Sequence, residues 1–106
     1  MKKKKTKNPF EEIAEVLDDC MYEAAPYRYI ELSGIGLSCI FTYREGLMKF
    51  IIERFENAKY IDALIINNFG EKFLIYRNSN LINIGVLKII DGFLNYSLRK
   101  EIHLTR

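Results

Sequence analysis

Histidine, cysteine, proline and tryptophan are scarce or missing in this sequence of 106 residues, which has one His, two Cys, two Pro and no Trp. Cys20 and Cys39 lie too far apart in sequence to form a zinc-binding pair, and His103 alone does not complete a metal site with them. We interpret both cysteines as reduced, buried thiols of an intracellular protein, with a single disulfide between them as the alternative. Because His103 lies near the C-terminus, neither cysteine has an expected general base beside it.

Other signatures of catalysis are also missing. We interpret Gly34 and Gly36 as tight-turn glycines, because no third glycine and no Gly-Lys-Ser/Thr sequence follows at the spacing of a phosphate loop. Adjacent carboxylates occur only as Glu11–Glu12 and Asp18–Asp19, on a helix face that is expected to meet water. The sequence therefore predicts a protein that is not an enzyme and that holds no cofactor and no metal.

Long apolar runs are missing as well. A membrane-spanning helix needs about 18 consecutive, mostly apolar residues, and no segment approaches this length. The basic start is followed by Asn8–Pro9 and acidic residues, where a signal peptide would have its apolar core. We therefore expect a cytoplasmic protein without membrane contact. The abundance of Ile, Lys, Asn and Tyr is typical of AT-rich genomes and is compatible with a phage, an archaeal virus or an archaeon.

Apolar residues are plentiful, at 49% of the chain with seven Phe and seven Tyr, which is enough for the core of one domain. The charge is unevenly divided. Five of the 16 basic residues lie in the first seven positions: Lys2, Lys3, Lys4, Lys5 and Lys7. The rest of the chain has 11 basic and 14 acidic residues, unlike a surface made to hold duplex phosphates. We expect a flexible basic tail over residues 1–8 and a single α+β domain over residues 9–106.

The first predicted helix begins after Asn8, a suitable N-cap, with Pro9 at its first position. Helical spacing of apolar residues continues to Ala24, and Pro26 prevents any continuation. The opposite face is acidic and is a candidate surface for binding a partner: Glu11, Glu12, Glu15, Asp18 and Asp19.

After the first helix, the pattern strand, turn, strand, helix occurs two times. Predicted strands cover Tyr27–Ser33, Leu37–Tyr43, Ile61–Asn67, Lys72–Arg77 and Leu81–Gly85, and predicted helices cover Glu45–Lys59 and Val86–Ile102. Leu81–Gly85 is alternatively the first turn of the last helix. The predicted fold is α+β, a mainly antiparallel sheet of about five strands with three helices, in the order αββαβββα.

Burial patterns within these elements give further expectations. In the first strand, Ile30 and Leu32 alternate with Tyr29 and Glu31. The three adjacent apolar residues 64–66 predict a strand that is buried on both faces. Phe50 widens the apolar arc of the middle helix, so we expect this helix to be covered on two sides, by its own sheet and by something else.

Gly92 lies inside the last predicted helix. A glycine at such a position costs about 1 kcal/mol relative to alanine. We attribute it to close packing of the helix against the sheet, with a hinge as the alternative.

The order of elements resembles the roadblock and longin-like domains of the profilin-like group. The stretch ALIINNFGEKFLIYRNSNLINIG, Ala63–Gly85, is similar to their hairpin and third strand, and the segment from Val86 onward is similar to their closing helix. The resemblance implies a non-enzymatic scaffold that dimerises through the middle helix and the adjacent edge strand and binds small GTPases or larger assemblies. The positions matching that surface are Lys49, Phe50, Ile61, Leu64 and Ile66. The middle helix and its linkers are shorter than in a roadblock domain.

Four functions remain open. The first is a protein-interaction module, homodimeric, that acts as a scaffold or regulator by binding a macromolecular partner, since Tyr is common at interfaces. The second is a small phage or viral inhibitor of a host nucleic-acid-handling complex, in which the acidic helix face imitates phosphate charge. The third is nucleic-acid binding through the lysine tail, which would weaken steeply with salt. An enzyme comes last, because no residue pattern assigns a reaction.

Overall fold

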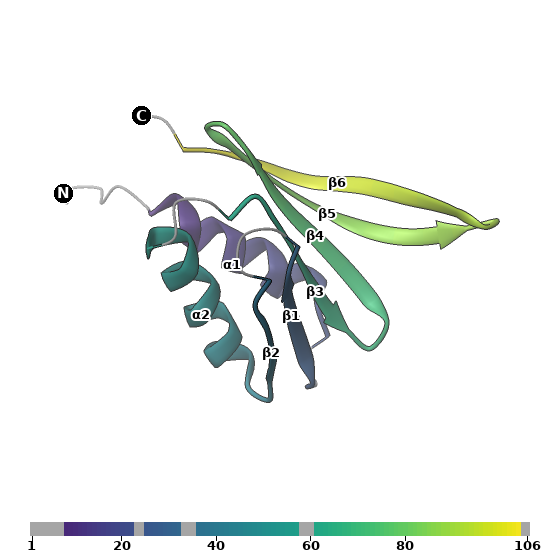
Figure 1. Ribbon diagram of the computed structural model, residues 1–106, viewed down its shortest axis with the longest axis horizontal. Coiled ribbons are helices and arrows are strands. Elements are labelled where there is room, and N and C mark those ends of the chain that lie inside the picture. Colours follow the sequence, from purple (N-terminus) through teal and green to yellow (C-terminus); the bar gives the residue numbers. More distant parts are fainter. Residues whose placement is uncertain (1–7, 23–24, 33–35, 58–60, 105–106) are drawn as a thin grey trace.

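The computed structural model describes residues 8–22, 25–32, 36–57 and 61–104. Within these ranges the chain forms two helices and six strands: α1 (Pro9–Cys20), β1 (Tyr27–Glu31), β2 (Ser38–Phe41), α2 (Arg44–Asn57), β3 (Ala63–Asn68), β4 (Glu71–Asn78), β5 (Leu81–Ile90) and β6 (Phe93–His103). The strands form one sheet in the order β2-β1-β3-β4-β5-β6, and all neighbours are antiparallel. Both helices lie against one face of the sheet, and the β5–β6 hairpin extends past them (Figure 1).

The α+β class is confirmed, but the predicted count of about five strands and three helices is wrong. Residues 86–102, expected as a closing helix, belong to β5 and β6, which pair on either side of a turn at Asp91 and Gly92. Both turn residues have positive φ, 52° and 81°, as in a type I′ turn. This turn twists in the same sense as the strands that it joins, and Asp-Gly is one of its preferred sequences. The observed order is therefore αββαββββ.

Helix α1 begins where the sequence predicts. The side-chain Oδ1 of Asn8 accepts a hydrogen bond of 2.9 Å from the Phe10 N–H, and Pro9 occupies the first helical position. The helix ends at Cys20, well before the proline that was expected to limit it. Its buried side chains are Ile13 and Leu17.

Helix α2 packs against both the sheet and α1. Phe50 makes an edge-to-face contact with Tyr29 of β1, with ring centroids 5.0 Å apart, and a tilted contact with Phe41 of β2 at 5.1 Å. Phe55 stacks on Phe10 of α1 at 5.9 Å. The apolar arc of this helix is therefore covered on two sides, and the second cover is α1.

Strand β3 alternates between the two faces of the sheet. Leu64 is fully buried beneath the helices, whereas Ile65 is only half-buried on the opposite face, so β3 is not buried on both faces as predicted. At the end of the strand, the buried Asn68 side chain accepts a hydrogen bond from the Tyr22 N–H and donates one to the Pro26 carbonyl oxygen, both at 3.0 Å. These two bonds fasten the connection between α1 and β1 to the sheet.

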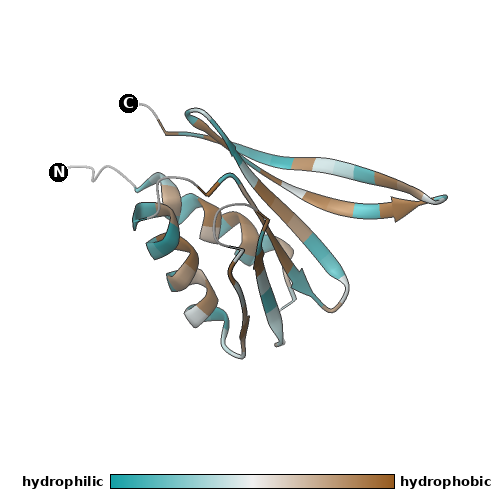
Figure 2. Ribbon diagram, in the orientation of Figure 1, coloured by the Kyte–Doolittle hydropathy of each residue, from teal (hydrophilic) through white to brown (hydrophobic). Residues whose placement is uncertain are grey.

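The molecule has principal dimensions of 51 × 29 × 29 Å. The β5–β6 hairpin lies at one end of its longest dimension (Figure 1). Strand β5 is buried from Ile82 to Val86 and becomes exposed toward the turn. Strand β6 is exposed from Phe93 to Glu101, and only Ile102 enters the core. Apolar residues nevertheless continue along both strands toward the turn, as Figure 2 shows.

Candidate functional site

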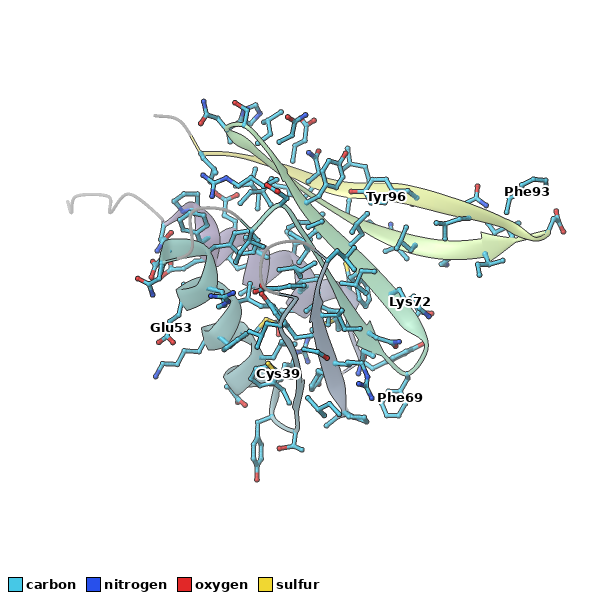
Figure 3. The ribbon with its side chains drawn as sticks, in the orientation of Figure 1. Cys39, Glu53, Phe69, Lys72, Phe93 and Tyr96 are labelled. Carbon is cyan, nitrogen blue, oxygen red and sulfur yellow. The ribbon has the colours of Figure 1, made fainter. Side chains whose placement is uncertain are left out.

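The β5–β6 hairpin carries a group of large apolar side chains that neither described helix covers. We call this group the hairpin surface, and it consists of Ile89, Ile90, Phe93, Leu94, Tyr96 and Leu98. Ile89 is 75% exposed, Phe93 74% and Leu94 69%. Figure 3 shows Phe93 at the outer end of the hairpin and Tyr96 nearer to the body of the protein. Large exposed apolar side chains gathered in this way mark a site of contact with another molecule.

The register distributes the hairpin surface over both faces of the sheet. Side chains alternate between faces along each strand, and paired residues share a face. Ile89 is paired with Leu94 and points away from the helices, and Tyr96 lies on the same face. Ile90 and Phe93 are paired next to the turn and lie on the other face of the hairpin. The hairpin is thus apolar on both sides near its tip.

Tyr96 anchors the hairpin surface to the rest of the sheet. Its ring centroid lies 5.9 Å from that of Tyr76 on β4. The ring also covers Gly85, where an added Cβ would lie 2.4 Å from two of its carbon atoms, so only glycine leaves room for it. Burial, together with the neighbouring Tyr76, raises the pKa of Tyr96 to about 12. Tyr96 is therefore an uncharged, amphipathic member of the hairpin surface at neutral pH.

A groove of about 650 Å³ lies beside the hairpin surface. It is lined by Gly70, Glu71, Lys72, Leu87, Lys88, Ile89, Ile90 and Leu94. Three members of the hairpin surface contribute to this lining. A partner side chain can therefore be enclosed there, and enclosed apolar anchors are the contacts that contribute most to protein–protein affinity.

A second groove, of about 910 Å³, lies along α1 and α2. Its charged lining residues are the acids Glu11, Asp18, Glu45, Glu53 and Glu56 and the bases Arg44 and Lys49. Arg44 joins the helices through an ion pair of 2.9 Å with the Asp18 carboxylate, and the Asn8 side chain donates a hydrogen bond to Glu56 near the other end. The excess of carboxylates favours a basic partner over an acidic one.

The structure brings together only part of the predicted acidic face. Glu11 and Asp18 line the groove between the helices. Glu15 and Asp19 are exposed on α1 outside this lining, and Glu12 is half-buried. The predicted basic tail, with its lysines at positions 2–5 and 7, lies outside the described residues.

The residues predicted to form a dimer surface lie mostly in the core. Ile61, Leu64 and Ile66 are at most 3% exposed, so their side chains are not accessible to a second copy. Phe50 is half-buried between β1 and β2, and only Lys49 is exposed. Strand β3 also lies between β1 and β4, not at an edge of the sheet. The described sheet has its edges at β2 and β6.

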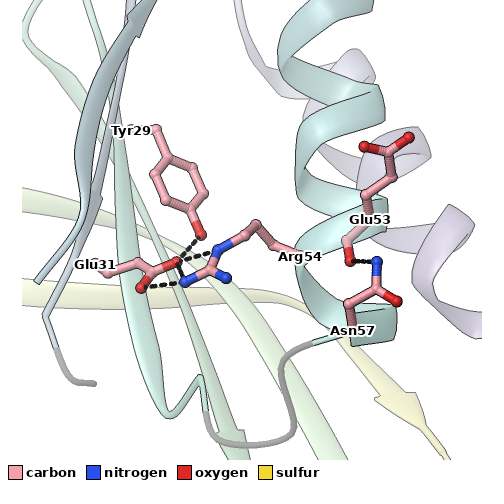
Figure 4. Close-up of polar contacts among 5 residues, drawn as sticks. All are labelled: Tyr29, Glu31, Glu53, Arg54 and Asn57. Carbon is pink, nitrogen blue, oxygen red and sulfur yellow. Dashed lines mark hydrogen bonds and ion pairs between the residues drawn. The ribbon is translucent and has the colours of Figure 1, made fainter. Parts of the chain in front are cut away.

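A buried polar cluster joins β1 to α2. Glu31 is 4% exposed, and its two carboxylate oxygens accept hydrogen bonds of 2.8 and 2.9 Å from Nε and Nη2 of Arg54. The Tyr29 hydroxyl donates a third bond of 2.6 Å to the same carboxylate (Figure 4). The side chains of β1 alternate as predicted, and Tyr29 and Glu31 face the core while Ile30 faces the other side.

The protonation of this cluster favours a structural role. Burial, followed by the hydrogen bond to Glu31, raises the pKa of Tyr29. Burial alone would lower the pKa of Arg54, but the hydrogen bond and the negative charge of Glu31 outweigh it and raise that pKa. Tyr29 therefore keeps its proton and Arg54 its charge at neutral pH. The cluster fastens β1 to α2 and leaves no proton poised for transfer near pH 7.

The remaining candidate groups are separate. Cys20 is exposed and Cys39 half-buried, and both are free thiols, so the expectation of two buried thiols is wrong for Cys20. Among the described residues, no three His, Cys, Asp or Glu side chains are grouped so that they could hold a metal ion. In the same part of the chain, no helix is long and apolar enough to cross a membrane.

No family model, curated protein or solved structure matches this chain. The resemblance to roadblock and longin-like domains therefore stays a prediction. The closing helix that it implied is replaced by the second half of the β5–β6 hairpin.

Proposed function

We propose that this protein acts by binding another protein through the hairpin surface, as a scaffold or regulator, and that it catalyses no reaction. The observation that carries the proposal is the exposure of six large apolar side chains on two strands that extend past the helices. Exposed apolar surface of this kind on a monomeric protein is often functional.

The mode of binding follows from the sheet. The outer side of β6 has no partner strand in the described part of the chain. An extended segment can add to such an edge, where main-chain hydrogen bonds supply affinity and alternate side chains supply specificity. We place this activity in the cytoplasm, where free thiols such as Cys20 and Cys39 persist.

The test compares variants of the hairpin surface with a variant of the opposite sheet edge. A partner captured by the full chain is purified, and its dissociation constant is measured by calorimetry. Leu94→Thr should raise the dissociation constant at least tenfold, because it removes an exposed apolar anchor and keeps a β-forming side chain. Ile40→Thr changes another exposed large apolar residue, on β2, and should leave the constant unchanged. Equal affinity of all three chains would overturn the proposal.

The groove between α1 and α2 supports a second candidate function, inhibition of a host nucleic-acid-handling complex by phosphate-like carboxylates. The groove contains five acidic and two basic lining residues, and two of the acids belong to the predicted acidic face. Binding of a basic partner there should weaken with salt and with the double variant Glu53→Gln, Glu56→Gln. A hairpin variant should leave it unchanged, which separates the two candidates. Nucleic-acid binding through the basic tail also stays a prediction, tested by deletion of residues 1–7.

A further inference from the structure

Strand β6 is an unusually unprotected edge. It is 11 residues long, and no described strand pairs with its outer side. Proteins usually protect such edges with charged residues, proline or a bulge. From Phe93 to Leu98 the strand has no charge and no proline, and the first charged residue is Arg99, at the register shift. The six residues 93–98 therefore form an unprotected edge segment, which is a template for pairing with another strand.

The backbone and the apolar side chains of β6 point to the same contact. In a two-residue hairpin turn, the residues on either side, here Ile90 and Phe93, exchange both backbone hydrogen bonds. Every second residue of β6 then bonds to β5, and the residues between direct their N–H and C=O groups outward. These outward residues are Leu94, Tyr96 and Leu98. Their side chains are also the members of the hairpin surface that lie on the sheet face away from the helices.

We infer that the outer edge of β6 pairs with β6 of a second copy of this chain, antiparallel, with Tyr96 of each copy at the two-fold axis. This inference rests on the proposed function and names the partner of the hairpin surface. In this register Leu94 lies opposite Leu98 of the second copy, and the two Tyr96 rings lie side by side. Cross-strand pairs of large apolar residues are the contacts that stabilise a sheet. The two sheets then continue as one, which removes both exposed β6 edges.

Other registers use less of the edge. With Leu94 at the axis, Leu98 lies beyond the turn of the second copy and has no opposite residue on β6. With Leu98 at the axis, Tyr96 lies opposite Lys100. Only the axis at Tyr96 pairs all three outward residues with one another. It also places Arg99 opposite Phe93, so no like charges face each other along residues 93–99.

Charge permits this pairing. Residues 89–98 contain a single charged side chain, Asp91, so two copies approach without a concentration of like charge. A ladder of main-chain hydrogen bonds adds to this contact.

Light scattering coupled to size exclusion tests the inference on the full chain, over a concentration series from micromolar to millimolar. The wild-type protein should elute with twice the 12.5 kDa mass of one chain. Leu94→Lys should shift the mass to that of one chain at the same concentration, because a charge then lies in the apolar ladder. Ile40→Lys, on the other edge strand β2, should keep the doubled mass. Far-UV circular dichroism confirms that both variants remain folded.

Two results would overturn the inference. One is a wild-type chain that stays monomeric throughout the series. The other is a dimer that Leu94→Lys leaves intact, since the contact would then lie elsewhere. If Leu94→Lys does not fold, Leu98→Thr replaces it with the same expected loss of mass. If the wild type is monomeric but Leu94→Thr still weakens binding of a captured partner, the dimer inference fails and the proposed function stands. Failure of the inference and failure of the proposed function are therefore distinguishable.

Discussion

Glu31 is stable in the core because Arg54 and Tyr29 satisfy its carboxylate with three hydrogen bonds of 2.6 to 2.9 Å. A buried ion pair is of uncertain net benefit compared with two apolar residues, but removal of one partner leaves an uncompensated charge. The sequence contains no signal for this pairing, because Arg54 and Glu31 belong to different elements that only the tertiary fold brings together. The alternation within β1 therefore did not by itself indicate which of its two faces is buried.

Arg54→Met should lower the free energy of unfolding by about 3 kcal/mol, because Glu31 would remain buried without its charge partner. The matched control is Arg28→Met, which removes an exposed arginine from β1, the strand that contains Glu31. It should change stability by less than about 0.5 kcal/mol. Chemical denaturation of both variants measures the difference. Equal losses would show that the pair does not hold β1 to α2.

Gly85 is the second residue whose identity the packing dictates. An added Cβ would lie 2.4 Å from the Tyr96 ring and 2.7 Å from the carbonyl oxygen of Ser97, which is backbone and has little room to move. Gly85→Ala should therefore lower stability by about 1–3 kcal/mol, as overpacking does. Gly46→Ala in α2 is the control, since its Cβ would meet only Phe41 at 3.8 Å. It should raise stability by about 0.5–1 kcal/mol, because alanine favours a helix. Thermal unfolding measures the stability of both variants. A stability loss for Gly46→Ala, or no loss for Gly85→Ala, would contradict the close contact of Gly85 with Tyr96 and Ser97.

At the scale of elements, the first six were predicted as the right type, β5 was predicted only over its first half, and β6 was predicted as a helix. Asn8 and Pro9 fix the start of α1, and the turn at Phe69 and Gly70 fixes the β3–β4 hairpin, with φ of 55° and 82°. In residues 86–98, the apolar spacing satisfies a helix and a hairpin equally, because each strand arm is short and apolar on both faces. The Asp91–Gly92 pair decides between them, since positive φ at both positions is normal in a type I′ turn and rare in a helix.

Gly92→Ala distinguishes these two structures directly. In the hairpin the residue has φ of 81° and nothing within 4 Å of an added Cβ, so only backbone strain acts, and stability should fall by about 1 kcal/mol. In a helix the same change would raise stability by about 1 kcal/mol. Asp91→Asn is the control, because Asn-Gly suits the same turn. Denaturant unfolding gives the sign, and an increase for Gly92→Ala contradicts the hairpin.

At the scale of the whole molecule, the sequence predicted a domain with an apolar core but not which apolar residues are exposed. Leu64 and Ile66 are apolar strand residues, and nothing in a sequence distinguishes such residues in a core from those in an interface. The fold places them under two helices. Conversely, Ile89 and Leu94 lie in the segment that was predicted as a helix, and the hairpin exposes them. These exposed side chains were missed because the last element was predicted as the wrong type.

The molecule that results has a core covered on one face and an apolar hairpin at one end of its long axis (Figure 1). Its central feature is the outer edge of β6, where outward backbone groups and apolar side chains belong to the same residues. Covering this edge resolves a pairing hazard that a stable soluble protein does not ordinarily retain. A second copy of the chain covers it without any further component.

Amide hydrogen exchange at residues 93–98, followed by NMR at the concentration of the doubled mass, tests this feature most directly. If β6 pairs with β6 of a second copy, the amides of Leu94, Tyr96 and Leu98 exchange as slowly as those of Phe93, Asn95 and Ser97, because both sides of the strand are bonded. Fast exchange at Leu94, Tyr96 and Leu98, alternating with slow exchange at the other three, would contradict the pairing and leave β6 as a free edge.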